Sequence, residues 1–350
     1  MNMPLVTMCV MCHNQVEYIG LALRSALIQT YHPLEIVVVD DASTDGSWEL
    51  INKLVDEYNR NEDADRHDVK VYHNLECKGM LGNRQYCYTL SHGELVVNCD
   101  GDDVSFPNRV QALVAAWNRD GKRATILTSK AIIVDDRLNP MGILDLGEKP
   151  IGALLAVAAS VTRKFSTVEQ DAAYHAHDDL VFDLRARLFG HRLFVDQPLA
   201  LYRYGSGFSS GGDYRKKMVR GFTGIIAGMK QYDADLEVAK DDVTPSVYEN
   251  GKQAVVSQIE SASNALKLWR GKVFSERLLG YRLCGYGKMR LKEKVVGLLL
   301  LLPPVIGDAI LACLSGVQHM KMRVKSRNIN LNDFCVEDVL RSWRAEVGEG

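Results

Sequence analysis

Apolar runs that alternate with amphipathic stretches are the feature of this sequence that most restricts its fold. "LVTMCVM" (5–11), "LEIVVVD" (34–40), "VKVYHN" (69–74) and "ELVVNC" (94–99) are short and rich in β-branched or apolar residues, and stretches with helical spacing separate them. Strands that are apolar throughout, joined by helices, are typical of a parallel sheet that is covered on both faces. The first half of the chain therefore predicts an α/β fold with a mostly parallel sheet flanked by helices.

Acidic residues directly follow two of these runs. Asp40 and Asp41 end the second run, and "CDGDDVSFP" places Asp100, Asp102 and Asp103 behind the fourth. Ligands of such sheets bind beyond the carboxyl ends of the strands, so both acidic groups are expected at one rim. The glycine-rich dinucleotide fingerprint and the Walker phosphate loop are absent from the sequence. A divalent cation held by carboxylates is the remaining simple way to neutralise a diphosphate there.

Five motifs occur in order along residues 4–210. They are "VTMCVMCHNQVEYIG…LEIVVVDDASTDG", "KGMLGNRQ", "VVNCDGDDVSFPNRV", "HDDLVFDLRARLFG" and "VDQPLALYRYGSGFSS". This set resembles family 2 glycosyltransferases, whose fold is the Rossmann-like GT-A fold. The resemblance implies a catalytic domain over 1–210 that moves a sugar from a nucleotide-diphosphate donor to a hydroxyl of an acceptor, with Mg²⁺ or Mn²⁺ as cofactor.

The resemblance also implies roles for individual residues on the donor side. Asp102 matches the metal ligand, and Asp100 lies nearby, reaching the metal through water or contacting the ribose. Asp103 fits either a ligand or a carboxylate at the entry of the next helix. Asp41 matches the residue that contacts the nucleotide base, and Arg84 has the charge and motif position for the diphosphate, with a surface salt bridge as the alternative.

The acceptor side of the reaction needs a base, and the resemblance assigns it to Asp179. A carboxylate on the acceptor hydroxyl removes its proton as the anomeric carbon is attacked from the opposite face, which implies inversion. Asp178 stands where the family usually has Glu, and its like charge is expected to raise the pKa of the base. We expect Asp179→Asn to silence turnover while sparing donor binding.

Three departures from the family pattern affect the predicted site. His13 stands where an aromatic residue commonly precedes Asn14, and we assign it to the donor site, where its ring can stack on the base. "YRYG" replaces the usual Y-R-x-H, so a histidine near the metal or phosphate is missing; His175 and His177 either compensate or have a structural or acceptor-side role. The Q-x-x-R-W signature of processive enzymes is absent, which favours addition of one or few sugars.

The rest of the chain, 211–350, is predicted as a helical extension. Residues 267–350 carry 15 Lys+Arg against 8 Asp+Glu, whereas the preceding residues carry the remaining 27 against 36. The segment 295–317 is long enough to span a bilayer, but Pro303, Pro304 and Asp308 interrupt it. Basic residues on both sides favour a membrane-associating, interfacial segment over 267–327, with a buried hairpin of a soluble dimer or a true span as alternatives.

These features predict where the protein works and with what. We expect a glycan or lipid-linked saccharide acceptor, peripheral contact with the cytoplasmic face of a membrane, no nucleic-acid binding, and homo-oligomerisation through the C-terminal helices. The eight scattered cysteines, including the C-x-x-C of Cys9 and Cys12 inside an apolar run, predict buried reduced thiols of a cytoplasmic protein without a signal peptide. A sugar nucleotidyltransferase and a non-catalytic nucleotide- or glycan-binding module are the alternative functions.

Overall fold

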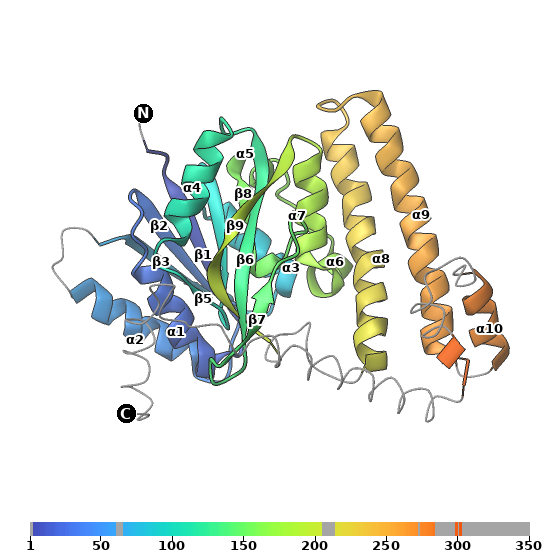
Figure 1. The fold of residues 1–350 in the computed structure, drawn as a ribbon, viewed down its shortest axis with the longest axis horizontal. Helices are drawn as coiled ribbons and strands as arrows, with labels where there is room; N and C mark the ends of the chain where they lie inside the picture. Colours follow the sequence, from blue (N-terminus) through green and yellow to red (C-terminus); the bar gives the residue numbers. More distant parts are fainter. Residues whose placement is uncertain are drawn as a thin grey trace.

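The computed structural model describes residues 3–60, 66–204, 214–271, 274–283, 298–299 and 301–302. Its sheet has the strand order β3-β2-β1-β4-β8-β6-β9-β5, with β7 paired to β6 (Figure 1). The strands are β1 (Val6–Cys12), β2 (Leu34–Asp40), β3 (Asp68–His73), β4 (Leu95–Asp100), β5 (Val104–Ser105), β6 (Ala124–Val134), β7 (Pro140–Leu144), β8 (Ala156–Ala158) and β9 (His191–Arg203). The helices of this part are α1 (Val16–Leu27), α2 (Ser47–Arg60), α3 (Met80–Thr89), α4 (Arg109–Arg119), α5 (Ala159–Thr162), α6 (Gln170–His175) and α7 (Asp178–Arg187), with a 3₁₀ turn at Gly152–Leu154.

The first four strands are parallel, as the apolar runs predict. β1 pairs with both β2 and β4 in parallel register, and β3 continues the sheet beyond β2. Beyond β4 the sheet becomes mixed. β8, β7 and β5 pair antiparallel to their neighbours, whereas β6 and β9 run parallel to each other. The short strands β7 and β8 were not predicted, since the sequence between 140 and 158 has no clear alternation of apolar and polar residues.

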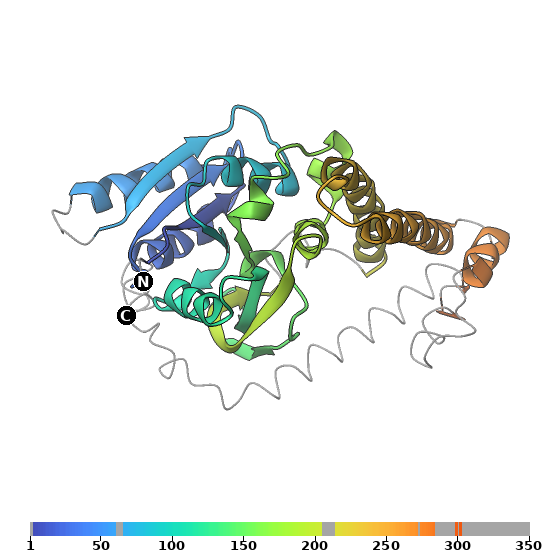
Figure 2. The ribbon, with the colours of Figure 1, turned by 90° about the horizontal axis from the view of Figure 1, so that it is seen from above.

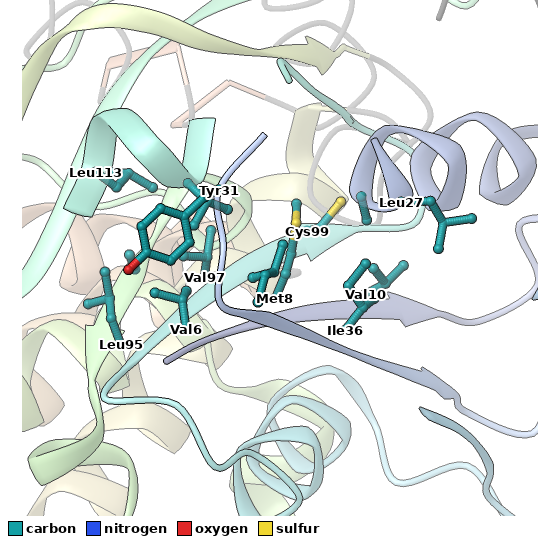
Figure 3. Packing of buried hydrophobic residues seen from close by; sticks show 14 of the residues in the cluster. Val6, Met8, Val10, Leu27, Tyr31, Ile36, Leu95, Val97, Cys99 and Leu113 are labelled. Atoms are coloured by element: carbon teal, nitrogen blue, oxygen red, sulfur yellow. The ribbon is translucent and has the colours of Figure 1, made fainter. Parts of the chain in front are cut away.

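Alternate residues of the parallel strands point to opposite faces of the sheet and fill two cores. Val6, Met8 and Val10 of β1 pack with residues of β2 and β4 against α1, α2 and α4 (Figure 3). Cys9 points to the other face, where a second core includes residues of α3, α6, α7 and α8. Since both faces are covered by helices, all seven residues of β1 and of β2 are buried, which explains why most of these residues are apolar.

The strand order reverses at β1, and this reversal positions the site. From β1 the chain proceeds outward on one side to β2 and β3, and then returns to place β4 on the other side. Met11 near the end of β1 lies beside Asp100 at the end of β4, and Cys12 lies beside Asp40 at the end of β2. In open α/β sheets the crevice for a ligand lies at such a switch point, outside the carboxyl ends of the strands.

The predicted helical extension is present as α8 (Tyr214–Ala239), α9 (Pro245–Arg270) and α10 (Phe274–Leu283). α8 lies beside α7, and α9 runs antiparallel to α8 on the side away from the sheet (Figures 1 and 2). Thr244 caps α9 by accepting a hydrogen bond from the Val247 amide, and Pro245 occupies the first turn. Most of the predicted membrane-associating segment, including 284–297 and 303–327, lies outside the described residues.

Membrane-spanning length was a specific alternative for the C-terminal segment. Within the part of the chain that the structure describes, no helix combines the length and the apolar character needed to cross a bilayer.

The five cysteines described, Cys9, Cys12, Cys77, Cys87 and Cys99, are free thiols, and all but Cys77 are buried. The predicted burial holds for four of these five residues, and Cys77 is half-exposed.

Candidate functional site

A cleft of about 460 Å³ opens at the carboxyl ends of β1, β2 and β4. Five of the six predicted site residues line it: His13, Asp41, Arg84, Asp100 and Asp102. The sixth, Asp179, is half-buried in the first turn of α7 and is not among the lining residues. The structure therefore brings the predicted donor-side residues together. One of them, Arg84, contacts α7 through Asp178, the residue before the predicted base.

Asp41 lies at the floor of the cleft and is almost fully buried. Its carboxylate accepts hydrogen bonds from the Asn74 side chain at 2.8 Å, from the backbone amides of Lys78 and Gly79 at 2.8 and 3.1 Å, and from the Cys77 thiol at 3.2 Å. Four donors hold the carboxylate in one orientation. The loop after β3 thus fixes the residue that the sequence assigns to the nucleotide base.

Gly79 makes this loop possible. Its φ is +75°, a conformation that side chains disfavour, and an added Cβ would lie 2.5 Å from the carbonyl oxygen of Ala173 on α6. Tyr174, the next residue of α6, also lines the cleft and donates a 2.5 Å hydrogen bond to the carbonyl oxygen of Cys77. The loop that holds Asp41 is therefore clamped by α6.

His13 stands at the mouth of the cleft with its ring held against β2. Its Nδ1 lies 2.6 Å from the carbonyl oxygen of Asp41, and Nε2 lies 3.2 Å from the Asn14 side-chain amide. His13, Asp41 and Cys77 each bring a possible metal-ligand atom within 4.8 Å of the others. Because Asp41 already accepts four hydrogen bonds, this cluster is satisfied without an ion.

Arg84 is only 1% exposed and pairs with two carboxylates from different elements. Its Nη2 donates to Asp100 Oδ1 at 2.8 Å, and its Nε forms an ion pair with Asp178 Oδ2. Burial disfavours the charged guanidinium, but Asp100 and Asp178 more than offset that cost and raise the pKa of Arg84. Arg84 is thus part of a buried charge network, which excludes the alternative of a surface salt bridge.

The acids after β4 have different surroundings. Asp102 is 8% exposed and lines the cleft, and its carbonyl oxygen accepts from Arg203 Nε at 2.9 Å. Asp103 accepts a 2.8 Å hydrogen bond from the Arg203 backbone amide. Burial, together with the charges of Asp102 and Asp100, raises the pKa of Asp103 well above its ordinary value. Asp103 therefore has a structural role in joining this loop to β9, at the strand that carries the "YRYG" motif.

The predicted base has a perturbed pKa. Burial raises the pKa of Asp179 from 3.8 to about 6, and the charge of Asp178 adds to the rise, while His177, the Leu180 amide and Arg84 oppose it. The expected effect of the neighbouring like charge is present, although burial is the larger cause. A carboxylate with a pKa near the working pH is suited to accept a proton and to release it again.

The two histidines near the base differ in environment. His177 is partly buried, and its Nε2 lies 3.3 Å from the carbonyl oxygen of Gly221 on α8. His175 is exposed at the end of α6. The contact of His177 with α8 supports a structural role, because it ties the N-terminus of α7 to the helical extension.

Several cleft residues were not predicted from the sequence. They are Cys77, Gly79, Asn83, Tyr174, Tyr202 and Arg203, together with Asn74, whose side chain donates to both Asp41 and Asn83. Asn74 follows directly at the end of β3, so the same rule that selected Asp41 and Asp100 would have selected it. Nothing in the sequence pattern indicated that α6 reaches the cleft.

Parts of this chain are similar in sequence to known proteins. Residues 7–179 match the family model described as "Glycosyl transferase family 2". The glucosyltransferase WfaP of Escherichia coli, named for UDP-Glc and alpha-D-GlcNAc-diphosphoundecaprenol, is 33% identical over 101 residues, which are 29% of this chain and 36% of that protein. A putative glycosyltransferase, EpsE of Bacillus subtilis, is 30% identical over 112 residues, 32% of this chain and 38% of that protein. The matched segment thus spans well under half the length of these relatives.

Solved structures are similar in fold. The mannosyltransferase PcManGT from Pyrobaculum calidifontis, solved with GDP-Man and Mn²⁺, superposes with a TM-score of 0.52 at 14% identity, covering 93% of this chain and 84% of that one. Residues 1–349 of TarS from S. aureus, solved with UDP-GlcNAc, give a TM-score of 0.50 at 16% identity, covering 81% and 91%. The predicted GT-A fold is therefore confirmed.

Proposed function

Because this chain belongs to glycosyltransferase family 2, we propose that its cleft binds a nucleotide-diphosphate sugar and transfers the sugar to a hydroxyl group. The observation that carries the proposal is the convergence of Asp41, Arg84, Asp100 and Asp102 on one cleft at the switch point of the sheet. A carboxylate held by four donors suits a base edge, and a guanidinium beside the acidic rim suits a diphosphate. The domain that does this chemistry is 1–210, and 211–350 is its helical extension.

The reaction proposed is a single displacement. The acceptor oxygen forms a bond to the anomeric carbon while the bond from that carbon to the diphosphate oxygen breaks, and the electron pair leaves with the nucleotide diphosphate. Asp179 takes the hydroxyl proton, for which a pKa of about 6 leaves it mostly ionised at neutral pH. Attack from the face opposite the leaving group inverts the anomeric configuration.

The residues present suit a divalent cation. Asp100 and Asp102 provide hard oxygen donors in one loop, and after burial, which is the largest cause, their negative charges raise the pKa of the adjacent Asp103. Such charge is relieved by Mg²⁺ or Mn²⁺, so we assign Asp102 as the ligand and Asp100 as its neighbour. The bound ion would supply charge neutralisation for the leaving diphosphate. Arg84 would share that task from the side of α3.

The acceptor we propose is a glycan or a lipid-linked saccharide at the cytoplasmic face of a membrane. One relative is named for a diphosphoundecaprenol-linked acceptor, and the basic composition of 267–294 in this chain, nine basic against two acidic residues, suits an anionic surface. Peripheral contact through 267–327 would bring the cleft to such an acceptor, and pairing through the C-terminal helices would make a homo-oligomer. Equal activity on soluble and lipid-linked acceptors would remove this part of the proposal.

A labelled-donor assay tests the function. The full chain is incubated with UDP-, GDP-, CMP- or dTDP-sugars, Mn²⁺ and candidate acceptors, and the products are resolved. A glycoside and free nucleotide support the transferase, released pyrophosphate identifies a nucleotidyltransferase, and binding without turnover identifies a non-catalytic module. A thermal shift with only one nucleotide series would fix the donor class, since ligand bound to the native state raises the melting temperature.

A further inference from the structure

Arg84 connects the donor side of the cleft to the helix that carries the base. The guanidinium comes from α3, lies between the carboxylate at the end of β4 and the first carboxylate of α7, and is nearly fully buried. Its Nη1 is buried and has no hydrogen-bond partner within the described residues. One cation is thus shared by Asp100 and Asp178, which are separated by 78 positions in the sequence (178 − 100).

Asp178 is fixed as firmly as Arg84. It is 5% exposed, and its Oδ1 accepts a 2.8 Å hydrogen bond from the Asp179 amide. A Cβ added at Gly152 would lie 2.8 Å from both carboxylate oxygens, so the absence of a side chain there leaves the room that Asp178 occupies. Asp178 therefore cannot approach the cleft as a second base, because its carboxylate is enclosed by Arg84, Gly152 and its own helix turn.

We propose that Asp178 is a positioning residue which, through Arg84, couples the acidic donor side of the cleft to the proton affinity of Asp179. The inference rests on the proposed function, in which Asp179 is the base. Asp178 holds Arg84 beside the cleft, and its negative charge lies one residue from Asp179, whereas Arg84 supplies the opposing positive charge. Any change in the charge around Asp100 is thereby transmitted to the base by a single buried side chain.

The charges around Asp179 are few enough to give opposite expectations for the two partners. Asp178 and His177 flank it on α7, and Arg84 faces it from α3. Asp235 of α8 is paired with Arg185, and Arg192 of β9 is paired with Asp183, so the charges of these two side chains are already neutralised. Loss of the negative charge of Asp178 should favour the ionised base, and loss of the positive charge of Arg84 should disfavour it.

The experiment measures turnover at saturating donor and acceptor between pH 4.5 and 8.5 for the full chain and its variants. Asp178→Asn, which keeps the acceptor for the Asp179 amide, should move the acid limb of kcat down by about one pH unit. Arg84→Gln should move the same limb up, and Asp178→Glu, which keeps the charge, should leave it near its original place. If Asp178 and Arg84 had only structural roles, Asp178→Asn and Arg84→Gln would not shift the acid limb of kcat in opposite directions.

Asp183→Asn is the matched control. Asp183 is also a buried aspartate on α7 with an arginine partner, but that partner, Arg192, does not line the cleft, whereas Arg84 does. Asp183→Asn should lower stability without moving the acid limb. The inference would be overturned if the acid limb of kcat lay at the same pH in Asp178→Asn and Asp183→Asn. It would also be overturned if Asp178→Asn and Arg84→Gln shifted that limb in the same direction.

A readout without turnover separates this inference from the proposed function. Carboxyl-¹³C NMR titration of aspartate-labelled protein reports the pKa of Asp179 directly, and the signal is identified by its loss in Asp179→Asn. Displaced titration in Asp178→Asn together with absence of transfer for every donor would refute the function and retain the coupling. Normal transfer with an unchanged Asp179 titration in Asp178→Asn would refute the coupling alone.

Discussion

A buried ion pair joins α8 to the catalytic half, and we predict a large effect from its removal. Arg185 of α7 donates to both carboxylate oxygens of Asp235 on α8, at 2.6 and 2.8 Å. The same guanidinium donates to the Gln85 side chain of α3 at 2.8 Å and lies 5.0 Å from the centre of the Phe165 ring. Arg185 and Asp235 are 1% and 2% exposed, so water cannot replace either partner.

Asp235→Asn removes the charge and keeps the shape, which leaves Arg185 buried without its counter-ion. Breaking a buried pair by removing one partner costs about 3–5 kcal/mol. At about 2–4 °C per kcal/mol, the melting temperature should fall by roughly 6–20 °C. Urea unfolding followed by tryptophan fluorescence should give the loss of free energy directly, because Trp117 of α4 and Trp269 of α9 report the two halves.

Asp233→Asn provides the control on the same helix. Asp233 pairs with Lys252 at 2.7 Å, but its side chain is 46% exposed, and such pairs contribute about 1 kcal/mol or less. The double variant with Arg185→Met and Asp235→Leu should recover part of the loss, since no uncompensated charge remains, although Gln85 loses its donor. If Asp235→Asn costs no more than Asp233→Asn, the claim that this ion pair joins α8 to the catalytic half is wrong.

Three further results are expected. Because the pKa of Asp179 is raised to about 6, the base is mostly protonated below that pH, and kcat at pH 5 should be roughly a tenth of its plateau. Asp179→Asn should lower the plateau by about 10²–10⁴-fold. A rate that stays constant down to pH 4.5 would contradict the assignment of Asp179 as the base. Chelation of divalent cations should reduce turnover by about 10²-fold and re-addition of Mn²⁺ should restore it, whereas full activity in EDTA would remove the role given to Asp102. Tyr174→Phe deletes the hydrogen bond to Cys77 and should raise the KM for the donor by about 2–10-fold with little change in kcat, which steady-state kinetics at varied donor concentration would test.

The parallel half of the fold could be predicted because its sequence carries a strong local signal. β1, β2 and β4 are buried on both faces, so most residues in them are apolar, and their boundaries in the structure lie within one or two residues of the predicted runs. β8 has only three residues, and the sequence of β6 does not indicate which neighbours it pairs with. Pairing partners that are distant in the sequence depend on tertiary docking, which apolar periodicity does not encode.

The site divides in the same way. Asp41, Asp100 and Asp102 are predictable because the carboxyl ends of parallel strands meet at one edge, so a position in the sequence implies a position in space. The partners of Arg84 are not predictable by that rule, because they depend on how α7 packs against α3. The contact of Tyr174 with the loop that holds Asp41 likewise depends on where α6 lies, and α6 is a helix of only six residues.

The helix that carries the base is held from three directions, and this has a consequence for how the two halves of the chain are related. Arg84 ties the first residue of α7 to the donor cleft, His177 contacts the Gly221 carbonyl on α8, and Arg185 ties the last turns of α7 to α8. A displacement of α8 would therefore shift α7, and with it the carboxylate that must reach the acceptor hydroxyl. If 267–327 contacts a membrane, α8 and α9 form the physical connection between that contact and the base, so attachment of the extension would act on kcat and not only on acceptor affinity.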